Sequence, residues 1–225
     1  MNSESQQEAA QHVCCPHCEA VQEVEPVTVI RPTDDSLVQL FKGTLNRVTC
    51  SSCETPFLLD VPLLFRDDDE KLLIYFIPMQ DIQKWREAEE QMKELTKTIF
   101  DDEIEAFEPQ CRLTLTRKTF VEKISLHLHR LNDRLIEYIK YQLYENPQKK
   151  IDPIRNELLY DFSAQDDGKL PFLVMDRESG QATAGAHIPI EIYSELASTF
   201  LTDSKLQEEL ASLFPGFYVS VEKLL

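Results

Sequence analysis

The sequence predicts an α+β protein: a small antiparallel β module at the N-terminus, then helices, then a C-terminal α+β unit. Three observations predict this class. Two Cys-x-x-Cys pairs lie among short strand-like segments, apolar residues recur at helical spacing between 82 and 99, and strand-like runs alternate with helical ones after 110. With 225 residues, 42% of them apolar, the chain can bury the core of one large domain or two modest ones.

The two cysteine pairs are Cys15-Pro16-His17-Cys18 and Cys50-Ser51-Ser52-Cys53. Each pair can turn tightly and direct two sulfurs toward one point, and two such pairs complete a tetrahedral thiolate site for zinc. Residues 19–49 separate them, which is longer than a minimal four-cysteine site requires but leaves room for a hairpin or a third strand. We therefore expect one structural Zn²⁺, bound by Cys15, Cys18, Cys50 and Cys53.

Two alternatives concern the same cysteines. Disulfides would need an oxidising compartment, but residues 1–13 carry no apolar run of a secretory signal. No stretch of 18 apolar residues would span a membrane either, so we expect a reduced, cytoplasmic protein. A Cys14-x₃-Cys18 pair would also have an allowed spacing. Pro16 favours Cys15 as the ligand, because it fixes φ near the value of a tight turn.

The N-terminal segments around these pairs are short and mostly extended. A strand is expected over 20–30, interrupted at Pro26. Asp34 and Asp35, followed by the run 37–41, suggest a short helix that closes at Gly43. Further extended segments are predicted at 45–49, 57–65 and 72–77, the last of them ended by Pro78. The pattern predicts a small antiparallel sheet with the metal at one end.

These residues also carry a family resemblance. Cys15-Pro16-x-Cys18, the second Cys-x-x-Cys, and the run 61–65 leading into 73–78 together resemble the CpXC domain of bacteria and archaea. The resemblance covers roughly 12–80 and, more weakly, 111–145, and it implies a zinc-bound β module with no assigned reaction. Many members carry Gly after each second cysteine, where this chain has Glu19 and Glu54. Since such a Gly usually has φ > 0, we expect these turns to be strained or differently closed.

The chain changes character at Asp81. An amphipathic acidic helix is predicted from Ile82 to Ile99, and 100–110 is the expected boundary between modules. The predicted organisation is therefore a disordered N-terminus at 1–11, the β module at 12–80, the helix and linker at 81–108, and the C-terminal α+β unit at 109–225.

The C-terminal unit is expected to begin with a strand at 112–116. A helix follows from a capping box formed by Thr119 and Glu122, and a second helix is capped by Asn132 or Asp133. The later elements are three strands (157–162, 170–175 and 183–188), two helices (189–200 and 204–213) and a terminal strand (217–221).

Other polar residues give no second site. His127 and His129 fall on different sides of their predicted helix, which makes them a poor metal pair. Cys111, beside Arg112, is expected to be a buried, inert thiol. No phosphate-binding loop, nucleophile elbow or His-Glu-x-x-His motif occurs, so no catalytic or cofactor-binding residue is assigned.

Charge is the remaining signal for function. The chain has 40 acidic and 23 basic residues, a net charge of −17, which disfavours binding to phosphate backbones and suits a basic protein partner. The favoured function is thus a zinc-stabilised interaction protein. The alternatives are a nucleic-acid-binding zinc ribbon using Lys42, Arg47 and Arg66, or an enzyme with an unrecognised active site in the C-terminal unit. The oligomeric state is left open.

Overall fold

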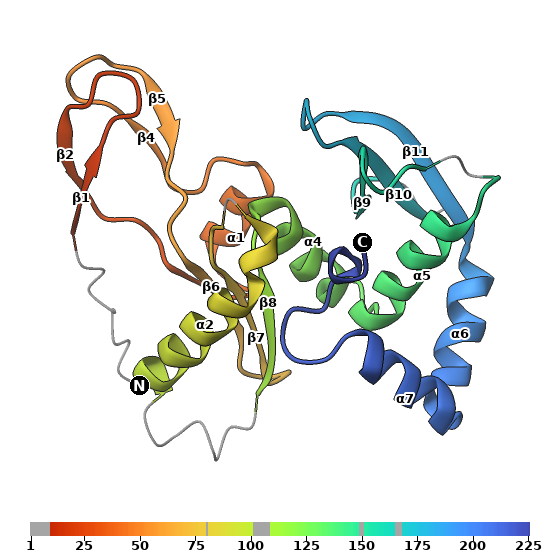
Figure 1. Ribbon diagram of the computed structural model, residues 1–225. Helices are drawn as coiled ribbons and strands as arrows, with labels where there is room; N and C mark the ends of the chain where they lie inside the picture. Colours follow the sequence, from red (N-terminus) through yellow and green to blue (C-terminus); the bar gives the residue numbers. More distant parts are fainter. Residues whose placement is uncertain (1–9, 80, 101–108, 149–150, 165–167) are drawn as a thin grey trace. The chain divides into compact units, whose positions relative to one another are not determined.

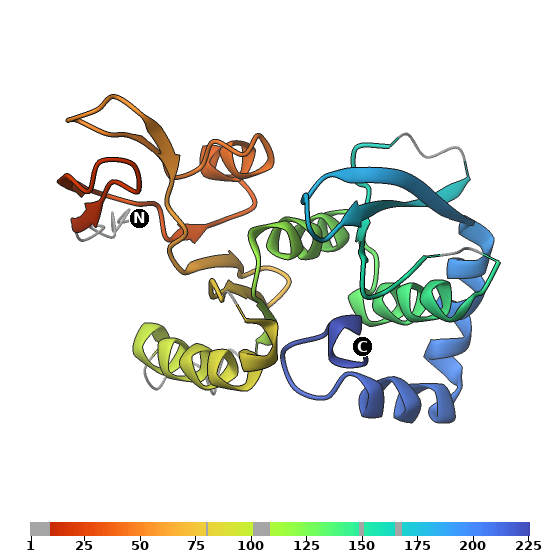
Figure 2. The same cartoon turned by 45° about the horizontal axis from the view of Figure 1, so that its top comes forward.

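The structure, a computed structural model, describes residues 10–79, 81–100, 109–148, 151–164 and 168–225. It confirms the mixed α+β class (Figures 1 and 2). Two compact units form, one from Met1–Gln80 with Glu90–Arg117 and the other from Asp81–Glu89 with Lys118–Leu225. Most of the predicted disordered N-terminus and the acidic run Asp101-Asp102-Glu103 lie outside the described residues.

A four-stranded mixed sheet is the core of the N-terminal unit. Its strands, in spatial order, are β3 (Val29–Ile30), β6 (Leu63–Asp67), β7 (Leu72–Phe76) and β8 (Gln110–Thr114). The β6–β7 pair is antiparallel, whereas β3 pairs with β6 and β8 with β7 in parallel. Every residue of β7 is buried, which explains its unbroken apolar sequence.

The helix predicted over 82–99 connects β7 to β8. It is formed as a 3₁₀ turn, η1 (Ile82–Lys84), followed by α2 (Trp85–Phe100). In the N-terminal unit Met92 is buried, and the hydroxyls of Thr96 and Tyr75 share a hydrogen bond of 2.7 Å. A helical connection lets the chain re-enter the sheet in parallel. Strand β8 therefore joins the N-terminal sheet and not the C-terminal unit in which the sequence analysis placed it.

Two hairpins extend from this sheet and carry the cysteine pairs. One pairs β1 (Gln11–Cys14) with β2 (Val21–Val24), and the other pairs β4 (Arg47–Thr49) with β5 (Pro56–Leu58). The predicted helix before the second hairpin is confirmed as α1 (Asp35–Phe41), which ends before Gly43 at φ +68°. Figure 1 shows the turns of the two hairpins side by side.

The C-terminal unit combines a three-stranded antiparallel sheet with helices. Its strands are β9 (Asn156–Tyr160), β10 (Lys169–Asp176) and β11 (Ala182–Pro189), with β10 in the centre. Its helices are α4 (Arg117–Leu128), α5 (Asp133–Glu145), α6 (Ile190–Thr202) and α7 (Ser204–Leu213). Strand residues such as Phe172 and Val174 share a buried apolar cluster with Ile136 and Ile139 of α5. The Asn132 side chain caps α5, as predicted, by accepting the N–H groups of the second and third residues after it.

Helices α4 and α5 are also joined by a buried network of charges. Lys140 Nζ lies 2.7 Å from a Glu122 carboxylate oxygen and 3.0 Å from Glu137, and Lys123 Nζ lies 3.2 Å from Glu137. All four side chains are at most 4% exposed. The capping box predicted at Thr119 is wrong, because α4 begins at Arg117 and the Glu122 side chain binds Lys140 in this network. Burial raises the pKa of Glu137, but the charges of Lys123 and Lys140 outweigh it and hold that pKa below its usual range.

The predicted terminal strand at 217–221 is also wrong. The segment has no strand partner among the described residues and ends in a 3₁₀ turn, η3 (Val221–Lys223). Its backbone N–H groups bond to carboxylates instead: Phe217 and Tyr218 donate to Glu89 Oε1 at 3.0 Å, and Val221 donates to Glu137 Oε2 at 2.9 Å. A buried N–H needs an acceptor, and side chains far away in the sequence supply it here.

Candidate metal centre

The two cysteine knuckles have the same backbone geometry. In each, the carbonyl of the first cysteine accepts the N–H of the residue four positions later, Glu19 at 2.9 Å and Glu54 at 3.0 Å. The N–H of the first cysteine donates to the carbonyl five positions later, at 2.9 Å from Cys15 and 3.0 Å from Cys50. Two copies of one turn therefore present two sulfurs each.

Backbone N–H groups also point at the sulfurs. The N–H of His17 donates to Cys15 Sγ and the N–H of Ser52 donates to Cys50 Sγ, both at 3.4 Å. Such bonds favour the thiolate over the thiol, and the thiolate is the form that binds metal. The His17 residue itself is exposed.

The four sulfurs form one compact group. Cys15 Sγ lies 3.8 Å from Cys53 Sγ, Cys18 Sγ lies 3.6 Å from Cys50 Sγ, and all four lie within 4.8 Å of one another. A tetrahedron with Zn–S bonds of about 2.3 Å has sulfur–sulfur edges of about 3.8 Å. The donor set and its spacing thus fit a tetrahedral metal ion that prefers thiolates.

Burial differs between the members of this group. Cys15 and Cys50 are each only 1% exposed, whereas Cys18 is exposed and Cys53 is intermediate. Cys14 is exposed and lies outside the sulfur group. The structure therefore brings together the four cysteines that the sequence analysis preferred, with Cys15 and not Cys14 facing the others.

The thiols have unequal acidities. The side-chain hydroxyl and backbone N–H of Thr55 lower the pKa of Cys53 to about 6, and the backbone N–H groups of Cys53 and Ser52 lower the pKa of Cys50. The N–H of Ala20 lowers the pKa of Cys18, but hydrogen bonds with neighbouring sulfurs and burial raise it to about 12. The thiolate is the form that binds metal, so a divalent cation displaces the protons that the four sulfurs still carry.

The family's glycine positions are left-handed in this chain although they are glutamates. Glu19 has φ 60° and Glu54 has φ 58°. The knuckles thus keep the ordinary turn and place a side chain where only glycine is unstrained, so the strain expected from the sequence is present in the backbone.

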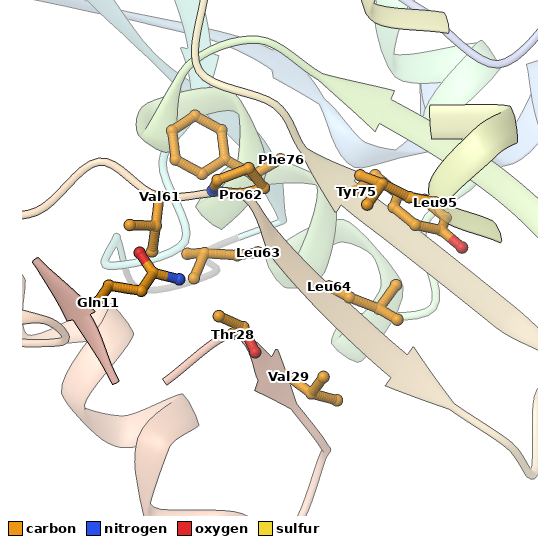
Figure 3. A pocket seen from close by; sticks show the side chains of 10 residues that line it. All are labelled: Gln11, Thr28, Val29, Val61, Pro62, Leu63, Leu64, Tyr75, Phe76 and Leu95. Carbon is orange, nitrogen blue, oxygen red and sulfur yellow. The ribbon is translucent and has the colours of Figure 1, made fainter. Parts of the chain in front are cut away.

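An apolar groove lies in the same unit, on the four-stranded sheet (Figure 3). Its volume is about 240 Å³. Figure 3 shows Thr28 and Val29 beside Leu64, with Val61 and Leu63 near Gln11 of β1. The remaining lining residues are Pro62, Tyr75, Phe76 and Leu95. The sequence analysis missed this groove; its only signal was the apolar run at 61–65.

The other residues considered from the sequence form no second centre. His129 stacks edge-on against Tyr160, with ring centroids 5.7 Å apart, and its Nδ1 lies 2.8 Å from the Ser125 carbonyl. Cys111 is buried as expected, and burial raises the pKa of its thiol. Arg66 is one of the basic residues considered for contact with phosphates, and its Nε lies 2.5 Å from the Asp68 carboxylate oxygen Oδ1.

In the described segments, no helix combines the length and hydrophobicity that crossing a bilayer requires. No curated protein and no solved structure shows significant similarity to the chain. The CpXC protein family matches residues 13–140, which is more than half of the sequence and includes both knuckles, the four-stranded sheet and most of α5. On this match, the chain belongs to the CpXC family.

Proposed function

We propose that this protein is a cytoplasmic, zinc-stabilised interaction protein that binds a basic protein partner and uses its metal only for structure. The observation that carries the structural role of the metal is the closed set of four sulfurs. Four protein ligands leave no coordination position for water or substrate. The ion would join two hairpins whose strands have only three or four residues each. Gln22 of β2 already links them, since its side chain donates to the Thr49 carbonyl at 3.3 Å and accepts the N–H of Ser51 at 2.8 Å.

The groove of Figure 3 supports a protein partner. Its lining is mostly aliphatic and aromatic, and Leu95, one of the lining residues, is 37% exposed. A concave apolar surface of this size accommodates one or two apolar side chains of a bound segment. Anchoring by such side chains is the usual source of affinity at protein interfaces.

Charge supports a basic partner. The chain carries a net charge of −17, and a zinc tetrathiolate would add −2, giving −19. This field accelerates encounter with a positively charged surface and opposes the approach of phosphates. The apolar groove would then supply affinity, and the acidic surface would supply selection and association rate.

Photocrosslinking tests the groove directly. A benzoylphenylalanine in place of Leu95 should give a discrete protein adduct in the native host, and Val61→Lys in the same chain should abolish it. A matched control places the crosslinker at Val38 on α1, which is 50% exposed and does not line the groove, and should give no such adduct. Equal adducts at both positions, or adducts with nucleic acid, would contradict the proposal.

The charge contribution has its own test. Asp68 and Asp69 are exposed, so reversing both to Lys should slow association with the partner more than it changes dissociation. Asp67 is left unchanged, because it is buried and its carboxylate accepts the N–H of Glu70 at 3.2 Å. Association that does not depend on salt would leave the acidic surface without a role in binding.

A further inference from the structure

The two edges of the C-terminal sheet differ. At the β9 edge, the N–H of Tyr160 donates to Glu122 at 2.6 Å and the N–H of Leu158 donates to the Tyr144 hydroxyl at 2.9 Å, so side chains cover the outward backbone groups. At the opposite edge, β11 pairs with β10 on one side, and no other strand of the described residues pairs with it (Figure 1). One edge of this sheet is closed and the other is open.

The register shows which groups of β11 face outward. The N–H of Ile190 donates to the Gly168 carbonyl, and the pairs Leu170↔Ile188 and Phe172↔Ala186 follow at intervals of two. In an antiparallel pair, alternate residues bond to the neighbouring strand. Gly185 and His187 therefore direct their N–H and C=O groups away from β10, and both residues are exposed. A register shift next to Ala184 limits the regular stretch to Ala184–Pro189.

This edge lacks the usual protection against strand pairing. Exposed edges commonly carry charged side chains, Lys above all. Here residues 179–190 form a run of twelve without Asp, Glu, Lys or Arg, the longest such run in a chain with 28% charged residues. Two molecules with a net charge of −17 repel one another, and the uncharged side chains of this edge add no like charges to that repulsion.

We infer that β11 pairs antiparallel with β11 of a second copy of this chain, joining two three-stranded sheets about a two-fold axis at Ala186. In this register Gly185 of each copy lies opposite His187 of the other copy. Each of these two residue pairs exchanges two backbone hydrogen bonds, which makes four in total. Ala186 meets its own equivalent, where a small side chain fits the narrow spacing of a non-hydrogen-bonded pair. The His187 ring lies opposite Gly185, which has no side chain to compete for that space. The interface is small, so the dimer forms at micromolar concentration.

Amide hydrogen exchange on the full-length, zinc-loaded protein tests the register. Between 2 µM and 200 µM (roughly the range that spans micromolar association), exchange at Gly185 and His187 should slow at least tenfold. Exchange at Ala186 and Ile188, which bond to β10 within one chain, should change little. Exchange at Gly185 and His187 that is equally fast at both concentrations would overturn the inference.

Sedimentation equilibrium with matched variants tests the contact itself. The wild-type chain should move toward twice its mass of 26.1 kDa as concentration rises. Gly185→Pro removes an outward N–H that β10 does not use and should weaken the dimer at least tenfold. Gly185→Ala keeps that N–H, and within its own chain its Cβ would approach no atom more closely than the Phe172 carbonyl oxygen at 4.0 Å, so it should weaken the dimer much less than Gly185→Pro does. A chain that stays monomeric at 200 µM, or dimers that Gly185→Pro leaves unchanged, would refute the pairing. Protection of these amides only by a different protein would also refute it.

Discussion

Replacing Glu19 and Glu54 by glycine should tighten metal binding. Both residues have φ near 60°, where a residue with a Cβ is strained by about 1–2 kcal/mol. Glycine removes that strain, but its greater freedom in the unfolded knuckle costs about 0.5–1 kcal/mol. The midpoints of these two ranges leave a net gain of about 0.75 kcal/mol for each knuckle, which corresponds to roughly a three- to fourfold higher affinity for zinc. The double variant should gain roughly tenfold if the two turns act independently.

Chelator competition on the full-length chain measures this gain. The matched controls are Glu19→Ala and Glu54→Ala, which remove the same carboxylates but keep a Cβ at the strained position. Because the loss of negative charge near the site is common to both sets, the difference between Gly and Ala isolates the backbone strain. Equal affinities for the Gly and Ala variants, or weaker binding by the Gly variants, would refute the reasoning that the knuckles store strain.

Three further substitutions test the C-terminal unit. Lys140→Met should lower the free energy of unfolding by about 3–5 kcal/mol, because it leaves buried Glu122 and Glu137 without the cation that they share. Urea denaturation measures this loss, and a loss below about 1 kcal/mol would contradict a tightly coupled network. Asn132→Ala removes the cap of α5 and should cost about 1 kcal/mol in the same assay, whereas Asn132→Ser should restore most of it. Gly216 has φ +76°, and Gly216→Ala places a Cβ 2.8 Å from a Glu89 carboxylate oxygen, so the thermal midpoint of unfolding should fall. The fluorescence of Trp85, which lies near Tyr218 of this segment, should change as well. An unchanged midpoint would contradict the close contact.

Local features of the site were predictable from the sequence. Each knuckle turn depends on residues within five positions, and the glycines that many family members carry where this chain has Glu19 and Glu54 indicated strained or differently closed turns, of which the strained form is observed. Likewise, the cap at Asn132 depends only on its own helix. Such features need no knowledge of the rest of the chain.

Features that depend on distant partners were not predictable. Glu122 was interpreted as a capping residue because Thr119 precedes it, but its partners are Lys140 and the N–H of Tyr160. The alternating apolar pattern at 217–221 predicted a strand, but the backbone bonds to carboxylates of Glu89 and Glu137. Periodicity reports which side chains are buried, and it does not report which acceptor the backbone finds. For the same reason, the apolar run at 61–65 indicated an apolar segment but not that this segment lines a groove.

The central claim is that Cys15, Cys18, Cys50 and Cys53 bind one structural metal ion, and cobalt substitution tests it most directly. The full-length chain should bind one equivalent of Co²⁺ with a thiolate charge-transfer band and tetrahedral d–d bands, and zinc should displace it. Cys53→Ser should lose most of the charge-transfer intensity, while Cys14→Ser should match the wild type, because its residue lies outside the sulfur group. Absence of stoichiometric metal, or a requirement for Cys14 in place of Cys15, would contradict the account.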